Sequence, residues 1–245
     1  MKLRLKQFLA ITGRFTSGDE ILDAINRGKI GINNKTFTNP NYFLNPKMDK
    51  VTYNNEIVRK QKKLYYLMYK PAGYLSSKLT NQERALGKKS AFELFNTLKL
   101  SEAETKSLFL VGRLDEDTEG LIIATNDGEL SSRITSPESR IEKEYECVLQ
   151  KALSEKDAER IKKGVAITLE ENGKAISYTT KPAKLKHHAN KASIIIIEGK
   201  KREIRRIFEA LGNKVLSLKR VRIGKLTLGK LKPKEMQNIA KENIY

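Results

Sequence analysis

The chain has 245 residues, 39% of them hydrophobic, which is enough to bury a sizeable core and excludes a disordered tail. Its only cysteine, Cys147, excludes an intramolecular disulfide, and no spacing of Cys and His predicts a metal site. The apolar segment Phe8–Ile11 behind the charged N-terminus is too short for a signal peptide, and no stretch approaches a membrane span, so we expect a cytoplasmic protein.

The formal net charge of +19 is unevenly distributed along the chain. Residues 1–63 hold 13 Lys and Arg against 5 Asp and Glu, residues 64–180 hold 17 against 19, and residues 181–245 hold 18 against 5. A bias of the whole proteome would spread basic residues evenly, whereas blocks of them are typical of a surface that binds a polyanion. The pattern favours a nucleic acid over an acidic membrane surface or a charge that serves only solubility.

Residues 1–59 predict a small α/β module that begins with two helices. One helical face is formed by Leu5, Phe8 and Leu9. The segment Ser17-Gly18-Asp19-Glu20 has the form of a capping box, so a second helix is expected to start there. Gly28 predicts the end of that helix, because glycine readily adopts the left-handed conformation that terminates helices.

Two short strands are expected to follow, Lys29–Ile32 and Val51–Tyr53, with a turn at Asn33-Asn34 after the first strand. This layout resembles the RNA-binding module of ribosomal small-subunit protein four, which stands at the N-terminus of many RNA-modifying enzymes. Such modules usually have adjacent arginines at the start of the second helix, where this chain has Gly18-Asp19. The remaining candidates for phosphate contacts are Arg14, Arg27 and Lys29.

Residues 60–63 are a charged joint without predicted structure, and residues 64–245 form the predicted second domain. Strands are expected at Tyr65–Met68, Leu108–Val111, Glu144–Leu149 and Ser193–Ile197. Helices are expected at Ala91–Lys99, Ser154–Gly164 and from Ile204 to Gly212. Because strands and helices do not alternate strictly, we predict an α+β fold with a largely antiparallel mixed sheet flanked by helices.

The most informative segment is Gly112-Arg113-Leu114-Asp115-Glu116-Asp117-Thr118-Glu119-Gly120-Leu121, followed by an apolar run and Asn126-Asp127-Gly128. It resembles the signature of pseudouridine synthases, in which a G-R-L-D segment carries the single essential aspartate.

Lys70-Pro71-Ala72-Gly73 is either an ordinary turn or the K-P-x-G element of this family. Asp115 alone could be only a turn-former. A calcium loop is excluded because its twelfth position is Asn126 rather than glutamate.

The resemblance implies roles for three catalytic residues, Asp115, Tyr145 and Arg205. Tyr145 lies in a segment similar to the K-x-Y strand, whose tyrosine packs against the uracil ring. Arg205 lies in Glu203-Ile204-Arg205, similar to a motif whose basic residue pairs with the essential aspartate, although many members have glutamine in place of Glu203. The implied reaction breaks the glycosidic bond of a uridine and rejoins the base through carbon five, without cofactor or metal. The carboxylate is either a nucleophile or a base.

Three alternatives compete with these roles. Tyr145 could be a core aromatic residue, and Arg205 could belong to a solvated helix face. Cys147 and His187-His188 could form a thiol–imidazole pair, but an isolated cysteine in a strand is more often a small buried hydrophobe.

A uridine inside a duplex must be flipped out, at a cost of a few kcal/mol, and basic surfaces that bind RNA offset that cost. Arg113 is expected to grip the phosphate of the flipped nucleotide. Further substrate contacts are expected from Lys143, Lys200, Lys201, Arg202 and Arg206, from Lys219, Arg220 and Arg222, and from Arg27 and Lys29 of the first module.

Segments near the end of the chain, Arg220–Gly224 and Leu226–Leu228, are similar to the RsuA/RluB group of ribosomal RNA pseudouridine synthases. Ser132–Pro137 and Thr180–Ala183 look most like its RsuA branch, which implies a uridine of small-subunit rRNA as the target. The alternatives are a large-subunit rRNA target and a non-catalytic ribosome-assembly factor. We expect a monomer whose partner is ribosomal RNA or a pre-ribosomal particle.

Overall fold

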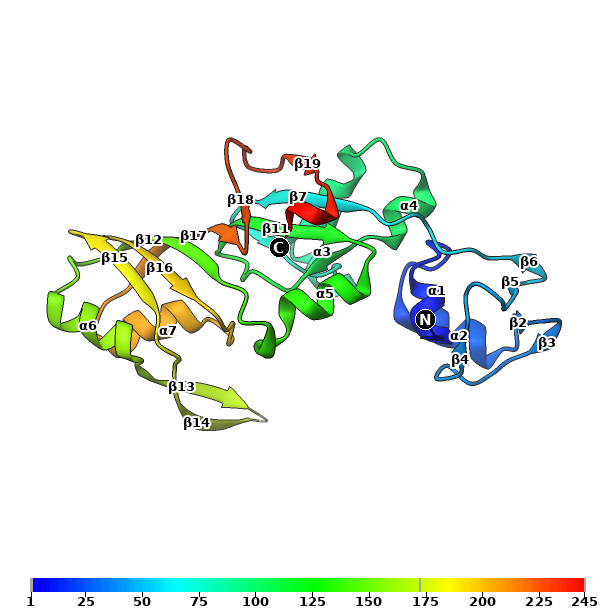
Figure 1. The fold of residues 1–245 in the computed structure, drawn as a ribbon, viewed down its shortest axis with the longest axis horizontal. Coiled ribbons are helices and arrows are strands. Elements are labelled where there is room, and N and C mark those ends of the chain that lie inside the picture. Colours follow the sequence, from blue (N-terminus) through cyan, green and yellow to red (C-terminus); the bar gives the residue numbers. More distant parts are fainter. Residues whose placement is uncertain (1, 172, 245) are drawn as a thin grey trace. The chain divides into compact units, whose positions relative to one another are not determined.

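The computed structural model describes residues 2–171 and 173–244, and the chain folds into two compact units (Figure 1). Unit one consists of Met1–Leu64, Phe95–Phe109 and Thr125–Asp127, and unit two consists of Tyr65–Leu94, Leu110–Ala124 and Gly128–Tyr245. The predicted α+β class is confirmed. The structural units do not follow the division drawn from the sequence, which placed residues 95–109 and 125–127 in the second domain. The functional division into an RNA-binding module and a catalytic domain stays a prediction.

Two short helices begin unit one, α1 (Leu5–Ala10) and α2 (Gly18–Asn26). Ser17 caps α2 as predicted, because its hydroxyl accepts a hydrogen bond from Glu20 N at 3.1 Å. The return bond of the expected capping box is different, since Glu20 Oε2 accepts from Thr16 N at 2.6 Å. Gly28 follows α2 with φ +66°, so the predicted end of the helix is confirmed.

The strands of unit one form a small sheet and a separate ribbon. The sheet has the antiparallel order β3-β2-β5-β6, with β2 (Ile30–Ile32), β3 (Lys35–Thr36), β5 (Val51–Tyr53) and β6 (Glu56–Ile57). The predicted asparagine turn joins β2 to β3, with φ of 51° at Asn33 and 65° at Asn34. The ribbon pairs β1 (Leu3–Arg4) with β4 (Phe43–Leu44). Apolar side chains of both helices and of the sheet form one buried core.

A set of buried polar side chains, Ser107 and Thr125–Asp127, connects distant segments of unit one, and we call it the polar clamp. Asn126 donates to Lys62 O at 2.7 Å and to Ser107 Oγ at 3.2 Å, and it accepts from Leu64 N at 2.9 Å. The Thr125 hydroxyl donates to Leu64 O at 2.6 Å and accepts from Asp127 N at 3.0 Å. The predicted joint at 60–63 therefore has no helix or strand but is held by hydrogen bonds, next to α4 (Glu102–Ser107).

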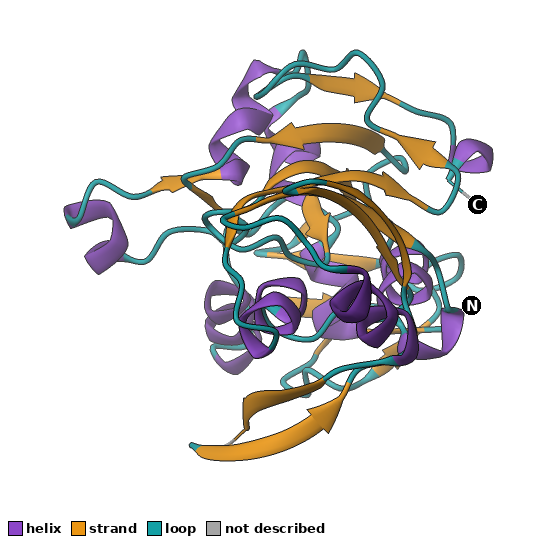
Figure 2. Cartoon of the chain, turned by 90° about the vertical axis from the view of Figure 1, so that its left-hand side faces the viewer, coloured by secondary structure: helices purple, strands orange, loops and turns teal. Residues whose placement is uncertain are grey.

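Unit two is built on a curved sheet with the strand order β15-β16-β12-β17-β11-β7-β19 (Figure 2). The members are β7 (Tyr65–Lys70), β11 (Glu119–Thr125), β12 (Lys143–Leu149), β15 (Lys184–His188), β16 (Lys191–Ile196), β17 (Val215–Ile223) and β19 (Met236–Asn238). β10 (Phe109–Val111) pairs with β11, and β18 (Leu226–Thr227) pairs with β17. Pairing from β15 through β17 is antiparallel, whereas β11 and β17 run parallel. The expected mixed sheet is thus confirmed.

Helices α6 (Glu155–Lys163) and α7 (Glu203–Ala210) lie along one side of this sheet (Figure 1). The predicted limits of α6 are confirmed, since Ser154 caps its start and Gly164 ends it. α7 buries Ile204, Ile207 and Phe208 on one face, as their spacing predicts. The remaining helices are α3 (Asn81–Ala85), α5 (Gly128–Thr135) and the 3-10 turns η1 (Ala91–Thr97), η2 (Pro137–Ser139) and η3 (Lys241–Asn243).

Several elements after residue 64 were not predicted from the sequence. Residues 91–97 form a 3-10 helix rather than an α-helix to residue 99. Strands β13 (Ala166–Glu171) and β14 (Lys174–Thr179) form a hairpin that projects as a two-stranded arm, and β8 (Tyr74–Leu75) pairs with β9 (Lys89–Ser90). β17 escaped prediction because its basic residues obscure the apolar alternation. Among the described residues, no helix has both the length and the hydropathy to cross a membrane.

Candidate active site

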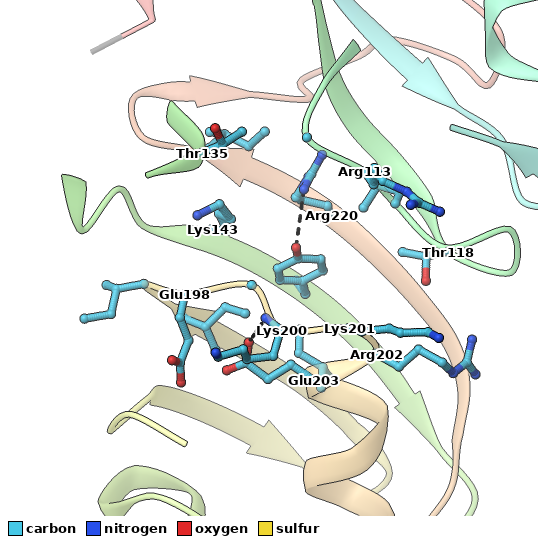
Figure 3. A pocket seen from close by; sticks show the side chains of 18 of the residues that line it. Arg113, Thr118, Thr135, Lys143, Glu198, Lys200, Lys201, Arg202, Glu203 and Arg220 are labelled. Carbon is cyan, nitrogen blue, oxygen red and sulfur yellow. Dashed lines mark hydrogen bonds between the residues drawn. The ribbon is translucent and has the colours of Figure 1, made fainter. Parts of the chain in front are cut away.

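A pocket of about 740 Å³ opens in unit two (Figure 3). It lies between the loop that follows β10, the strands β12 and β17, and the segment that precedes α7. The volume suits a ligand as large as a nucleotide, since ligand sites typically span about 300–1,000 Å³. Several predicted site residues line this pocket together, namely Arg113, Asp115, Lys143, Tyr145, Lys200 and Arg202.

Asp115 lies in the loop between β10 and β11, with 34% of its side chain exposed. The loop is fixed on both sides of the carboxylate. Ser76 Oγ donates to Leu114 O at 2.8 Å and accepts from Leu114 N at 3.1 Å, and Gly73 N donates to Glu116 O at 2.7 Å. The carboxylate therefore faces the pocket from a backbone held by hydrogen bonds, which suits a group that must meet a reacting atom in one orientation.

Lys70 lies beside the same loop, with its ammonium 3.5 Å from Glu116 O. Its side chain is fully buried, and its ammonium donates to Pro71 O at 2.9 Å and Tyr74 O at 2.7 Å. Burial lowers the pKa of Lys70 to about 8, and the nearby carboxylate of Asp115 opposes that shift. Lys70 thus places positive charge beside the loop without reaching the pocket lining.

The expected pairing of Arg205 with Asp115 is not what the structure shows. Arg205 is buried, and its Nη2 atom lies 3.1 Å from Asp117 Oδ2 and 3.0 Å from Asp117 O. Nη1 donates to Val215 O at 2.9 Å. Arg202 lies closer to Asp115, at 3.9 Å from Nη1 to Oδ2, and it also pairs with Asp117 at 3.2 Å. Arg205 is therefore no part of a solvated helix face, and it ties α7 and β17 to the loop that carries Asp115.

Tyr145 and Arg220 stand next to each other on β12 and β17. The side chain of Tyr145 is largely buried, but it lines the pocket, and its hydroxyl accepts a hydrogen bond from Arg220 Nη1 at 3.4 Å (Figure 3). Nε of Arg220 donates to Leu121 O at 2.7 Å. Parallel β11 approaches β17 closely because Gly120, with φ +108°, has no side chain, and a Cβ there would lie 2.2 Å from Arg220 O.

A pair of buried carboxyl groups, Glu198 and Glu203, closes another side of the pocket. Glu203 Oε2 accepts from Lys200 N at 2.7 Å, and Glu198 accepts from Tyr178 Oη at 2.5 Å and from Lys181 N at 2.7 Å. Burial, and then the neighbouring Glu198, raise the pKa of Glu203 to about 8. A proton on Glu203 makes this group neutral, like the glutamine that the family resemblance leads one to expect.

The predicted RNA contacts are distributed over both units. Arg113 is exposed at the pocket, and burial lowers the pKa of Lys143, whose ammonium donates to Ile141 O at 3.3 Å. Arg206 lies on α7 outside the pocket lining. In unit one, Lys29 is exposed and Arg27 forms an ion pair with Asp23 at 2.7 Å.

The expectation that Arg220 binds the RNA backbone from a solvated surface is wrong, whereas the same expectation for Arg222 stays a prediction. Arg220 is buried, and Arg222 forms ion pairs with Glu142 at 3.0 Å and Glu144 at 2.9 Å. Lys219 points elsewhere, with its ammonium 5.2 Å from the ring centre of Tyr69. The faces of β17 explain the error, because residues 218, 220 and 223 line the pocket, while 219, 221 and 222 line a second hollow that shares no residue with it. The alternation of faces holds from 218 to 221 and shifts before 222, where the pairing with Glu144 and Tyr145 is irregular.

Cys147 is buried, and desolvation raises the pKa of its thiol to about 12. This confirms its interpretation as a small buried hydrophobe, because a thiol with such a pKa forms almost no thiolate at neutral pH. Among residues 2–171 and 173–244, no group of three or more His, Cys, Asp or Glu side chains is arranged to hold a metal ion.

Comparison with known proteins matches residues 64–210 to the family model described as RNA pseudouridylate synthase. The chain is 31% identical to the ribosomal small subunit pseudouridine synthase A of Escherichia coli, over 99% of this chain and 98% of the relative. It is also 31% identical to an RNA pseudouridine synthase of Aquifex aeolicus, over 95% of this chain and 88% of the relative. A solved structure described as a pseudouridylate synthase superposes with a TM-score of 0.66 at 27% identity and covers 99% of this chain and 98% of its own.

Proposed function

Because the chain belongs to the RNA pseudouridylate synthase family, and is thus an enzyme that isomerises uridine to pseudouridine in RNA, we propose that its substrate is small-subunit ribosomal RNA. The observation that carries the assignment of the site is the position of Asp115, on a hydrogen-bonded loop at the edge of a nucleotide-sized pocket that Tyr145 also lines. The full-length similarity to the small-subunit synthase of Escherichia coli supports this choice of RNA.

In the proposed reaction the target uridine leaves its helix and enters the pocket, where its base packs against Tyr145. The ionised carboxylate of Asp115 acts on the nucleoside, either as a nucleophile or as a base toward the sugar. The bond from N1 to the sugar breaks, the base turns, and carbon five bonds to the sugar. Carbon five loses its proton and N1 gains one, so the reaction needs no redox partner and no cofactor.

Exposed cations around the pocket support RNA binding. Arg113 and Lys201 line the pocket as exposed side chains, and Lys200 lies over the ring of Tyr178 with its ammonium 4.8 Å from the ring centre. We assign the phosphates that flank the flipped uridine to these groups, and further contacts with the RNA backbone to Arg27 and Lys29 of unit one. Such binding weakens steeply with salt because counterions are released from the RNA. We place the enzyme in the cytoplasm as a monomer that acts on ribosomal RNA or a pre-ribosomal particle.

The test is to incubate the protein, and its Asp115→Ala variant, with unmodified small-subunit and large-subunit rRNA and to map pseudouridine at single-nucleotide resolution. The proposal predicts one modified uridine in small-subunit rRNA with the unchanged protein and none with the variant. Modification of large-subunit rRNA alone would show that large-subunit rRNA is the substrate, and the proposed substrate would be wrong. Activity in both proteins would refute the role of Asp115, and RNA binding without activity in either would favour an assembly factor.

A further inference from the structure

Four buried side-chain polar atoms have no hydrogen-bond partner among the described residues, namely Thr118 Oγ1, Glu203 Oε1, Arg205 Nε and Arg220 Nη2. All of these residues except Arg205 line the pocket. Buried polar atoms without partners are rare because they have lost water without gaining a replacement. Their concentration around one pocket indicates that a ligand supplies the missing partners. A proton on Glu203 allows it to bond to Glu198, whereas Arg220 has no such neighbour to satisfy its free nitrogen.

The guanidinium of Arg220 is held firmly by its other two nitrogens. Nε donates to Leu121 O at 2.7 Å and Nη1 donates to the Tyr145 hydroxyl at 3.4 Å, while the residue as a whole is only 4% exposed. The central carbon of the guanidinium lies 5.9 Å from the centre of the Tyr145 ring. A base packed against Tyr145 therefore has its edge within reach of Nη2. Arginine has donors only, so the partner of Nη2 must be an acceptor.

We propose that Arg220 Nη2 donates a hydrogen bond to a carbonyl oxygen of the flipped uracil, which makes Arg220 a residue that binds the base rather than the RNA backbone. The inference rests on the proposed function and extends it. When the bond from N1 to the sugar breaks, its electron pair stays on the base and spreads onto both carbonyl oxygens. A buried guanidinium bonded to one of these oxygens stabilises that charge as it forms.

Phosphate is the other acceptor that a guanidinium binds well, but the position of Arg220 argues against it. The phosphates of a flipped nucleotide stay with the strand, at the mouth of the pocket, where Arg113 and Lys201 are exposed. Arg220 is buried on a central strand, next to the tyrosine that would pack against the base. If the acceptor is O4, Arg220 also disfavours cytidine, which has an amino donor in that position.

The experiment measures single-turnover rates on an RNA fragment that spans the mapped uridine, with uridine, 2-thiouridine or 4-thiouridine at the target. Sulfur accepts hydrogen bonds more weakly than oxygen does. The thio base whose sulfur replaces the oxygen bonded to Arg220 should therefore react about tenfold more slowly with the unchanged protein. Arg220→Lys has a shorter side chain that no longer reaches the base. Its rate on the RNA with an ordinary uridine should be about 100-fold lower, and the same thio base should cause no further decrease. Arg160→Lys is the matched control, because Arg160 is an exposed residue of α6 that pairs with Asp157, and it behaves like the unchanged protein.

The inference is overturned if the unchanged protein is equally fast on all three substrates, or if Arg220→Lys keeps the full thio effect. An equal loss in Arg160→Lys overturns it too, because the loss would not be specific to the pocket. Should Arg220→Lys not fold, judged by circular dichroism, the thio series on the unchanged protein still decides. If neither thio base changes the rate but a phosphorothioate beside the target lowers it, Nη2 binds a phosphate instead. Failure of the unchanged protein on ordinary RNA would instead refute the proposed function.

Discussion

The polar clamp of unit one and the pocket of unit two are both clusters of buried polar groups, but only the first has its hydrogen bonds complete. Asn126 uses its amide in three bonds, and the Thr125 hydroxyl both donates and accepts. In the pocket, one buried atom each of Thr118, Glu203 and Arg220 has no hydrogen-bond partner among the residues that the structure describes. A cluster whose hydrogen bonds are complete stabilises the fold and has no donor or acceptor left for a ligand. A cluster with unpaired buried atoms is less stable but can bind a ligand that supplies the missing partners.

The comparison divides the sequence signature into two parts with different tasks. Residues 112–121 include the loop that presents Asp115 to the pocket, whereas Thr125–Asp127 hold the chain segment 62–64 in unit one. Substitutions in the second part should therefore lower stability with little effect on the chemistry of folded molecules. Substitution of the Asp115 carboxylate, in the first part, should do the reverse.

The largest effect on stability is expected from Asn126→Ala. The variant loses three hydrogen bonds and leaves Leu64 N buried without a partner, so the free energy of unfolding should fall by about 3 kcal/mol. Urea denaturation measures it. Asn96→Ala, at an exposed position of the same unit, is the matched control and should change stability by less than about 0.5 kcal/mol. One ordinary hydrogen bond contributes about 1 kcal/mol to stability. A smaller loss of unfolding free energy in Asn126→Ala would contradict the structural role of the clamp.

The next effect concerns Arg205, which the structure places on Asp117 instead of Asp115. Arg205→Lys shortens this link between α7 and the loop that carries Asp115, so the single-turnover rate should fall about 10-fold to 100-fold through misplacement of Asp115. Asp117→Asn should lower the rate in the same direction but less, because the bond to Asp117 O remains.

A double-mutant cycle sharpens this prediction. If Arg205 acts through Asp117, the two substitutions together should cost less than the sum of their separate costs. Glu116→Gln is a control in the same loop, since Glu116 pairs with the partly exposed Lys88, and it should leave the rate nearly unchanged. Strictly additive effects of Arg205→Lys and Asp117→Asn would contradict the link.

The smallest effect is a dependence of stability on pH that comes from Glu203. Burial raises its pKa to about 8, so between the unfolded value near 4.5 and this value the folded state binds more protons than the unfolded state. The free energy of unfolding therefore falls as pH rises through that window. Glu203→Gln removes this term, so its free energy of unfolding should fall less than that of the unchanged protein as the pH rises from 5 to 8.

Thermal or urea unfolding between pH 5 and 8 measures this difference. Glu209→Gln provides the control, because Glu209 is an exposed carboxylate of the same helix. The same pH dependence in Glu203→Gln and in the unchanged protein would contradict the assignment of the buried proton to this group.

Local signals in the sequence were sufficient where the structure depends on neighbouring residues. The caps at Ser17 and Ser154, the asparagine turn after β2 and the apolar face of α7 were predicted because each is set within a few residues. The signature loop was found in the same way. It contains acidic residues at 115, 116 and 117, and their order along the chain shows which one resembles the family's aspartate.

Tertiary geometry decided what the sequence left open. Asp115 and Asp117 are two residues apart, and only the path of α7 relative to the loop determines that Arg205 reaches the second of them. Arg220 was assigned to a solvated surface because its neighbours are basic. Once β17 is known to be a strand, the alternation of its faces places Arg220 on the same side as Leu218 and in the pocket.

The central claim is that the carboxylate of Asp115 performs the chemistry and contributes little to the fold. Asp115→Asn keeps the size of the side chain and removes its charge, so single-turnover conversion of the mapped uridine tests the claim directly. We predict a rate at least about 10⁴-fold lower, together with a free energy of unfolding within about 0.5 kcal/mol of the unchanged protein. A variant that converts uridine within tenfold of the normal rate, which corresponds to about 1.4 kcal/mol, would contradict the account.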